Sequence, residues 1–307
     1  MITQSLINRY LNHCELQKGL NFKTIKAYKT DLRQYAEFSF AHNNFSEKEC
    51  ICNFIESIHP RYKPKTIKRK LASLKAFFEY LMYEDLIEEN PFSRINFKIK
   101  EPLILPKIIP VKILAKILST AYSELGYCKS EYSAKCTLRD IAVLELLFAT
   151  GLRVSELCNL KKNDVNLNES YVKTFGKGAK ERIIQICTPD VLAALRQYKK
   201  AFYKEIQSTG YFFINRLSNH LSEQSVRFMI NKYVSRISDN VHITPHMFRH
   251  TFATMLLESD VDIRYIQRIL GHSSITTTEI YTHVSVAKQK QILKNKHPRK
   301  KLCINKG

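Results

Sequence analysis

The stretch LRDIAVLELLFATGLRVSELCNL, residues 138–160, decides the fold of the second half of the chain. The part before Gly151 is an apolar run of helical length, which predicts a buried helix. Gly151 makes a turn, and Arg153 then opens a short helix with Glu156 three residues further on the same face. The planar fork of an arginine can clamp two phosphate oxygens. Taken alone, the two residues are better explained by an ordinary ion pair on a helix.

A hairpin is predicted after this stretch. YVKTF (171–175) and ERIIQI (181–186) are rich in β-branched residues, and the GKGAK between them (176–180) is glycine-rich, as hairpin turns are. Further along, the helical segment RYIQRIL (264–270) ends at Gly271, a residue suited to a helix C-terminus. The second half is therefore predicted as a mixed α+β domain with a small antiparallel sheet.

Residues 1 to about 100 are predicted to be helical, because apolar residues recur at steps of three and four in NFKTIKAYKTDLRQYAEFSF (21–40) and TIKRKLASLKAFFEYLM (66–82). The second of these helices also has a basic face, with no acidic residue between Arg61 and Lys75. The basic face consists of Lys65, Lys68, Arg69, Lys70 and Lys75. Such a helix can pack its apolar face inward and lie on DNA phosphates with the other. A merely solvated face is the alternative.

Three prolines in KIKEPLILPKIIP (98–110) mark a boundary, because proline fixes φ and blocks the continuation of a helix. We therefore predict a first domain over 1–100, a linker over 101–110 and a second domain over 111–307. The chain as a whole is expected to be mainly α.

The formal net charge is +21, from 49 Lys and Arg against 28 Asp and Glu. This excess suits a polyanion and favours nucleic acid as the partner. An AT-rich genome also raises lysine usage, so the charge alone does not establish DNA binding.

Eight cysteines are scattered along the chain, and no pair has the C-x-x-C spacing of a zinc site. Several lie in apolar runs, which favours reduced core thiols in a cytosol. No stretch approaches the ~20 apolar residues of a membrane span. The N-terminal MITQSLINRY lacks the basic and apolar regions of a signal peptide. We therefore expect a cytoplasmic protein with no membrane partner.

The segment TPHMFRHTFAT (244–254) begins with a threonine cap and a proline suited to the first helical position. His246 and Arg249 share one face near the positive end of this predicted helix. A histidine that moves a proton beside an arginine that neutralises charge suits a phosphoryl-transfer site. His250 is the competing histidine, about a third of a turn from Arg249.

Lys177 lies at the tip of the predicted hairpin, between glycines that let the backbone approach a ligand closely. A mobile lysine there could protonate a leaving alkoxide. Lys180 and Arg182 are nearby competitors for this role, and a solvent-exposed turn lysine is the commoner explanation.

The segment LGHSSITTTEIYTHV (270–284) places His272 after the glycine and Tyr281 nine residues later. A tyrosine is a poor nucleophile at neutral pH, because its ordinary pKa is near 10. It needs neighbouring cations that stabilise the phenolate and the charged transition state. Taken alone, such a tyrosine is usually a packing residue.

Arginine, lysine, His-x-x-Arg, Gly-His and tyrosine follow one another in this order, which resembles the tyrosine recombinase (phage integrase) family and, within it, the Xer-type recombinases. ATGLRVSEL, FGKGAKER, TPHMFRHTFAT and LGHSSITTTEIYTHV carry the resemblance in the catalytic half. TIKAYKTDL and the basic helix carry it in the N-terminal half. The resemblance implies a helical core-binding (SAM-like) domain that clamps DNA, a catalytic domain with a C-terminal exchange tail, and chemistry that uses no metal or other cofactor.

The resemblance also implies a role for each matching residue. Tyr281 would attack the DNA phosphate and form a 3′-phosphotyrosyl bond, with His246 as general acid/base and Lys177 as proton donor to the 5′ leaving oxygen. A second group of residues would hold the scissile phosphate, and Glu156 would support this group. That group is Arg153, Arg249 and His272.

The partner implied is double-stranded DNA with a specific recombination site, bound by a homotetramer that passes through a Holliday junction. The tail SVAKQKQILKNKHPRKK (285–301) would dock into a neighbouring subunit, and a frayed basic tail on DNA is the alternative. The segment 121–136 looks longer than its Xer-type counterpart, as either a surface loop or an extra helical turn.

Three functions fit these features. The first is a site-specific recombinase, whether for integration and excision of a mobile element, DNA inversion or Xer-type chromosome dimer resolution. The second is a type IB topoisomerase-like enzyme, which uses the same bond chemistry as a monomer with little sequence preference. The third is a DNA-binding accessory protein with an inactive site. The helical first domain and the tail favour the first function, and the complete set of catalytic positions argues against the third.

Overall fold

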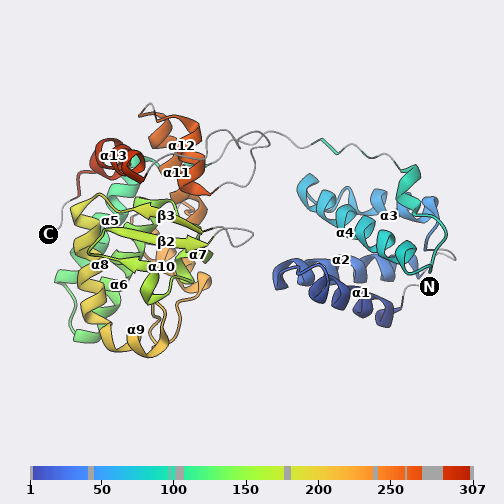
Figure 1. The fold of residues 1–307 in the computed structure, drawn as a ribbon, viewed down its shortest axis with the longest axis horizontal. Helices are drawn as coiled ribbons and strands as arrows, with labels where there is room; N and C mark the ends of the chain where they lie inside the picture. Colours follow the sequence, from blue (N-terminus) through green and yellow to red (C-terminus); the bar gives the residue numbers. More distant parts are fainter. Residues whose placement is uncertain are drawn as a thin grey trace. The chain divides into compact units, whose positions relative to one another are not determined.

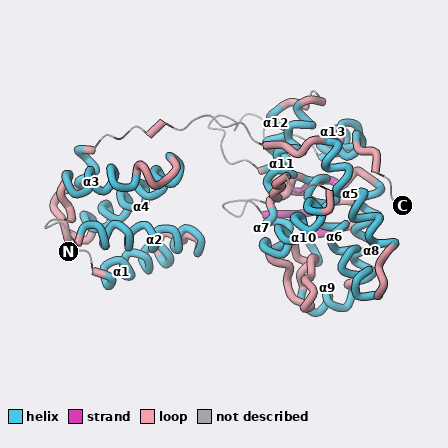
Figure 2. The backbone as a smooth tube through the Cα atoms, turned by 180° about the vertical axis from the view of Figure 1, so that it is seen from behind, coloured by secondary structure: helices cyan, strands magenta, loops and turns pink. Residues whose placement is uncertain are grey.

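The computed structural model describes residues 3–40, 45–95, 97, 99–100, 107–175, 181–237, 241–259, 261–271 and 286–304, apart from the side chains of 286–289. The chain divides into two units, Met1–Ile104 and Leu105–Gly307, each with its own hydrophobic core (Figure 1). Helices form most of the described part of both units, as Figure 2 shows, so the prediction of a mainly α chain is confirmed. None of the described helices is long and apolar enough to cross a membrane.

Helices pack around an aromatic core in the first unit. They are α1 (Gln4–Leu16), α2 (Phe22–Ser39), α3 (Lys48–Ile58) and α4 (Pro64–Tyr83), followed by the 3-10 turn η1 (Pro91–Arg94). Thr3 caps α1 and Asn21 caps α2, each by accepting a backbone N–H on its side-chain oxygen. The rings of Tyr35 and Phe54 meet edge to face with centroids 5.0 Å apart. The periodic apolar residues of the sequence therefore form the core that they predicted.

The basic face of α4 is smaller than predicted, because Lys70 points inward. Lys70 is only 2% exposed, and its Nζ donates a hydrogen bond to Asp31 Oδ1 at 3.0 Å. It lies three residues after Ile67 and four before Leu74, on the apolar stripe of the helix. A buried lysine whose charge is paired with Asp31 inside the unit does not fit the predicted contact of Lys70 with DNA phosphates. The other members of the predicted face are exposed, namely Lys65, Lys68, Arg69 and Lys75.

The second unit combines helices with a three-stranded antiparallel sheet of order β1-β2-β3. Before the sheet come α5 (Val111–Gly126), α6 (Glu131–Thr150), α7 (Val154–Cys158) and the 3-10 turn η2 (Lys162–Asp164). The strands are β1 (Val165–Asn166), β2 (Tyr171–Phe175) and β3 (Glu181–Gln185). After the sheet come α8 (Pro189–Ala201), α9 (Tyr203–Thr209), α10 (Glu223–Ser235), α11 (Pro245–Leu257), α12 (Ile263–Leu270), α13 (Val286–Lys296) and the 3-10 turn η4 (Pro298–Lys301).

The helix α6 is the centre of the second unit. It contacts α5, α8 and α11, and its residues 140–150 are all buried. It ends at Gly151, whose φ of 61° is left-handed. A Cβ on Gly151 would lie 2.7 Å from side-chain atoms of Phe252 and Leu270, so glycine also permits the close approach of α11 and α12. The segment 121–136 forms the end of α5, a short turn and the start of α6.

The predicted hairpin is present as β2 and β3. Val172 faces Ile184 and Thr174 faces Arg182 across the two strands. Val172 and Ile184 are fully buried and Thr174 is 3% exposed, so this side of the hairpin faces the core. Arg182 lies two residues from Ile184 and therefore also points to the interior side.

The tail after residue 285 packs on its own unit, with α13 lying beside β3 (Figure 1). Leu293 is fully buried, and the His297 Nε2 lies 2.7 Å from the carbonyl oxygen of Ala149. Burial lowers the pKa of His297 to about 4, so the ring is neutral near pH 7. Arg299 donates two hydrogen bonds to Glu145, at 2.9 and 3.0 Å. In this single chain the end of the tail is anchored to α6 and is not frayed.

Candidate active site

Arg153 and Glu156 form the pair that the sequence predicted, at the start of α7. The Arg153 backbone N–H donates to Glu156 Oε2 at 2.8 Å, and its Nη1 donates to Glu156 Oε1 at 2.7 Å. The second guanidinium nitrogen, Nη2, lies 3.3 Å from the carbonyl oxygen of Gly271. The Arg153 side chain is still 31% exposed, so this residue is accessible from solvent.

Arg249, on α11, reaches the same place from the interior. It is 4% exposed and donates hydrogen bonds to the carbonyl oxygens of Gly151 at 2.9 Å and Leu270 at 2.7 Å. Burial lowers the pKa of Arg249 to about 10, and the nearby charges of Arg153 and Arg182 act in the same direction. The guanidinium remains protonated at neutral pH, and a bound anion would offset the repulsion that it experiences.

Arg182 is the third arginine of the cluster. Its Nη1 and Nη2 donate to the two carboxylate oxygens of Glu156 at 3.1 and 2.7 Å. Burial by itself raises the pKa of Glu156, but the hydrogen bonds from Arg182 and Arg153 outweigh it, so this pKa lies below its ordinary value. Glu156 is therefore an anion that holds two arginines together, and the cluster keeps a net positive charge.

His246 and His250 are both exposed on the first turns of α11. They line an open hollow together with Lys107, His242, Thr244 and Met247. Burial lowers the pKa of His250, and the neighbouring His246 and Arg249 lower it further. Both histidines are thus reachable from solvent close to the arginine cluster.

Three of the predicted catalytic residues, Lys177, His272 and Tyr281, lie outside the described residues. In the sequence, Lys177 follows the end of β2 at Phe175, and His272 directly follows Gly271. The structure therefore brings together Arg153, Glu156 and Arg249 of the predicted site.

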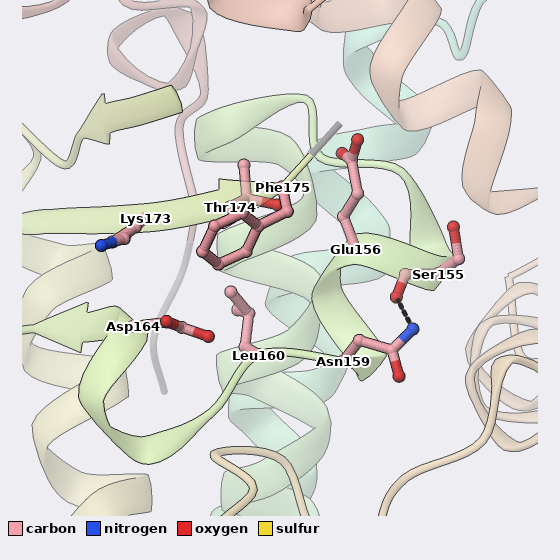
Figure 3. A pocket seen from close by; sticks show the side chains of 8 residues that line it. All are labelled: Ser155, Glu156, Asn159, Leu160, Asp164, Lys173, Thr174 and Phe175. Carbon is pink, nitrogen blue, oxygen red and sulfur yellow. Dashed lines mark hydrogen bonds between the residues drawn. The ribbon is translucent and has the colours of Figure 1, made fainter. Parts of the chain in front are cut away.

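A small pocket beside Glu156 shows how α7 lies against the sheet (Figure 3). It encloses about 150 Å³ and is lined from α7, η2 and β2. Asn159 is one of the lining residues, and its Nδ2 donates to the carbonyl oxygen of Ser155 at 2.8 Å. Thr174 and Phe175, which end β2, line the same pocket as Glu156. The end of β2 therefore lies close to the helix that presents Arg153.

Sequence reasoning missed the structural part played by Arg182, which it considered only as a competitor of Lys177. The alternation of side chains along a strand could have predicted its inward direction. Arg182 is two residues before the apolar Ile184 and is therefore on the same side of the hairpin. An arginine directed toward a core implies a buried partner, and Glu156 is that partner.

Both halves of the chain match known protein families. Residues 7–85 match the phage integrase N-terminal SAM-like domain, and residues 123–288, more than half of the chain, match the phage integrase family. A tyrosine recombinase of Agathobacter rectalis is 54% identical over 298 residues, which cover 97% of each chain. The tyrosine recombinase XerC of Thermodesulfovibrio yellowstonii is 37% identical over 303 residues, covering 96% of this chain and 97% of the relative.

Solved structures of recombinases share the fold. A lambda integrase dimer bound to a COC′ core site has a TM-score of 0.67 at 18% identity, covering 93% of this chain and all of the other. The recombinase XerH, bound to a palindromic difH substrate after cleavage, has a TM-score of 0.68 at 20% identity, covering 98% of this chain and 83% of the other. These similarities concern the fold, whereas the sequence matches establish the family. The chain belongs to the phage integrase family and is a tyrosine site-specific recombinase related to the Xer enzymes.

Proposed function

We propose that Tyr281 is the nucleophile with which this recombinase cuts and rejoins DNA at a specific site. The tyrosine oxygen bonds to the scissile phosphorus, the bond from phosphorus to the 5′ oxygen breaks, and a 3′-phosphotyrosyl bond remains. The energy of the phosphodiester is kept in this bond, so a 5′-hydroxyl can reverse the step without ATP. When the 5′-hydroxyl comes from the partner DNA, the strands are exchanged. Two rounds of strand exchange, with a Holliday junction between them, complete the recombination.

The observation that carries this proposal is the meeting of Arg153 and Arg249 beside Gly271, directly before His272. Negative charge grows on the non-bridging oxygens of the phosphate during the attack, and fixed guanidinium groups stabilise it without reorganising. A phosphate bound there also offsets the repulsion that helps to lower the pKa of Arg249. His272 would add a further hydrogen bond to the phosphate.

Two residues would move the protons. His246 accepts the phenolic proton of Tyr281 as general base, from its exposed position one turn before Arg249 on α11. Lys177 donates a proton to the 5′ oxygen as it leaves. Each proton is returned when the strand is rejoined, so the cycle needs neither metal nor cofactor as reactant.

The proposed partner is double-stranded DNA that carries a recombination site. The exposed basic residues of α4 would lie on its phosphates, namely Lys65, Lys68, Arg69 and Lys75. We propose that the chain acts as a homotetramer, the form in which lambda integrase is bound to a Holliday junction. Docking of the tail into a neighbouring subunit would exchange the contacts that Arg299 makes with Glu145 in the single chain.

The replacement Tyr281→Phe tests the nucleophile, because it removes the attacking oxygen and little else. On a nicked suicide substrate, whose cleaved fragment diffuses away, the variant should form no covalent protein–DNA complex while its Kd for the DNA stays the same. Denaturing gels measure the covalent complex and mobility shift measures the Kd.

The matched control is Tyr203→Phe, which removes the same hydroxyl from an exposed tyrosine on α9. It should form covalent complexes at the wild-type rate. Covalent complexes with Tyr281→Phe would refute the assignment. Relaxation of supercoiled plasmids that lack any recombination site would instead favour the topoisomerase-like alternative.

A further inference from the structure

The C-terminal end of α12 gathers the arginines of the site. The last carbonyl groups of a helix have no partner within it and carry the negative end of its dipole. Here three consecutive carbonyl oxygens each accept a hydrogen bond from a different arginine. The pairs are Ile269 with Arg182 Nε at 3.1 Å, Leu270 with Arg249 Nη2 at 2.7 Å, and Gly271 with Arg153 Nη2 at 3.3 Å.

Arg182 changes the charge balance around Glu156. If Arg153 were the only partner of this carboxylate, the two would form a neutral pair, and the carboxylate would compete with a phosphate for the guanidinium. Arg182 binds both oxygens of Glu156, so the three side chains together carry a net positive charge. The Glu156 side chain is only 7% exposed, so water screens this charge little.

Arg182 also joins two segments that carry proposed catalytic residues. It lies on β3, five residues after Lys177 in the sequence, and packs directly on the residue that precedes His272. A Cβ on Gly271 would lie only 2.7 Å from Arg182 Nη1. Movement of the hairpin relative to α12 would therefore have to break the Arg182 contacts.

We propose that Arg182 is a positioning residue for DNA cleavage. It neutralises Glu156 so that Arg153 remains available to the phosphate, and it fixes the hairpin strand β3 to the end of α12. This inference rests on the proposed phosphate-binding role of Arg153. It assigns Arg182 no contact with DNA, because its side chain is 11% exposed and its donors are directed at Glu156 and Ile269.

The test compares Arg182→Ala and Arg182→Lys with wild type on the nicked suicide substrate. A misplaced catalytic group costs about 10²-fold in rate, which is the loss expected for Arg182→Ala at saturating enzyme. Arg182→Lys keeps the charge but not the fork, so it should cleave at an intermediate rate. The Kd for DNA should stay within about twofold of wild type, because only transition-state stabilisation is lost.

Three further measurements separate positioning from other roles. In combination with Glu156→Gln, the effect of Arg182→Ala should be non-additive, since one of the two proposed roles of Arg182 acts through its contact with Glu156. A substrate with sulfur as the bridging 5′ atom, which leaves without a proton, should restore cleavage by Lys177→Ala and not by Arg182→Ala. Thermal unfolding shows whether each variant is folded. If Arg182→Ala does not fold, the cleavage rate of Arg182→Lys tests the inference.

The matched control is Arg227→Ala, which removes an arginine from an exposed pair with Glu223 and should cleave normally. Wild-type cleavage by folded Arg182→Ala or Arg182→Lys, additive effects with Glu156→Gln, or rescue by the bridging sulfur would each overturn the inference. Arg153→Ala and Tyr281→Phe are run in the same assay. If they fail while the Arg182 variants cleave normally, only this inference falls and the proposed function stands.

Discussion

Each arginine of the cluster binds backbone carbonyls or Glu156 before any DNA is present. Arg249 holds Gly151 and Leu270, and Arg153 holds Glu156 and Gly271. These contacts fix the guanidinium groups in advance, so little reorganisation is needed when a phosphate binds. The lowered pKa of Arg249 follows from the same arrangement, since burial and like charges both act against its cationic form.

Lys177→Ala should slow cleavage by about 10²- to 10⁴-fold, the range that general acid catalysis contributes. The loss arises because the 5′ oxygen then leaves without a proton. The single-turnover rate on the suicide substrate measures the effect, and a bridging 5′ sulfur should restore it.

Lys180→Ala is the matched control, because it removes the same kind of side chain three residues further along the sequence. It should cleave normally on both substrates. Slower cleavage by Lys180→Ala together with rescue by sulfur would show that the proton donor is Lys180.

Several site residues were predictable from sequence because their spacing is local. Arg153 and Glu156 pair within one helical turn, and Arg249 follows a proline that begins its helix. Arg182 was not recognised, because its contact with Glu156 spans 26 positions of the chain and arises only when the hairpin packs beside α7. Local patterns predict the residues of a helix face, whereas contacts between elements depend on how those elements pack.

At the scale of elements, α2 and α4 were predictable from apolar residues at steps of three and four, and α6 was predictable from its long apolar run. The hairpin was predictable from β-branched segments on both sides of a glycine-rich sequence. The strand β1 has two residues and was not predicted, because no period can be recognised over so short a segment. The inward direction of Lys70 was also missed. A lysine among apolar residues of α4 was assigned to the basic face by its charge, but Asp31 on α2 supplies a buried partner.

Lys70→Met should destabilise the protein without weakening DNA binding. Removing one partner of a buried ion pair typically costs about 3–5 kcal/mol. Arg69 and Ser73 also contact Asp31 and compensate its charge in part, so we expect roughly 2–3 kcal/mol. Denaturant unfolding measures the stability and mobility shift measures the Kd.

Lys65→Met is the matched control on the exposed side of the same helix. It should leave the free energy of unfolding nearly unchanged and weaken DNA binding. If Lys70→Met instead weakened DNA binding and left the free energy of unfolding unchanged, Lys70 would be a DNA-contacting residue.

At the scale of the whole molecule, the net charge of +21 is divided between buried and exposed groups. Lys70, Arg249 and Arg299 are buried and have partners within the protein. Charge counted from the sequence therefore overestimates the number of cations that can lie on DNA.

DNA binding should weaken steeply with salt, because each phosphate that is neutralised releases counterions. For about eight phosphate contacts, the slope of log K against log salt is about −7, and doubling the salt concentration lowers the affinity by about 10²-fold. Titrations at several salt concentrations measure this slope. Lys65→Met should reduce the magnitude of this slope by about one, the value for one phosphate contact. Lys70→Met and Tyr281→Phe should leave the slope unchanged. A slope near zero would contradict a binding mode that depends on phosphates, and an equal change for Lys65→Met and Lys70→Met would show that the two faces of α4 contribute alike.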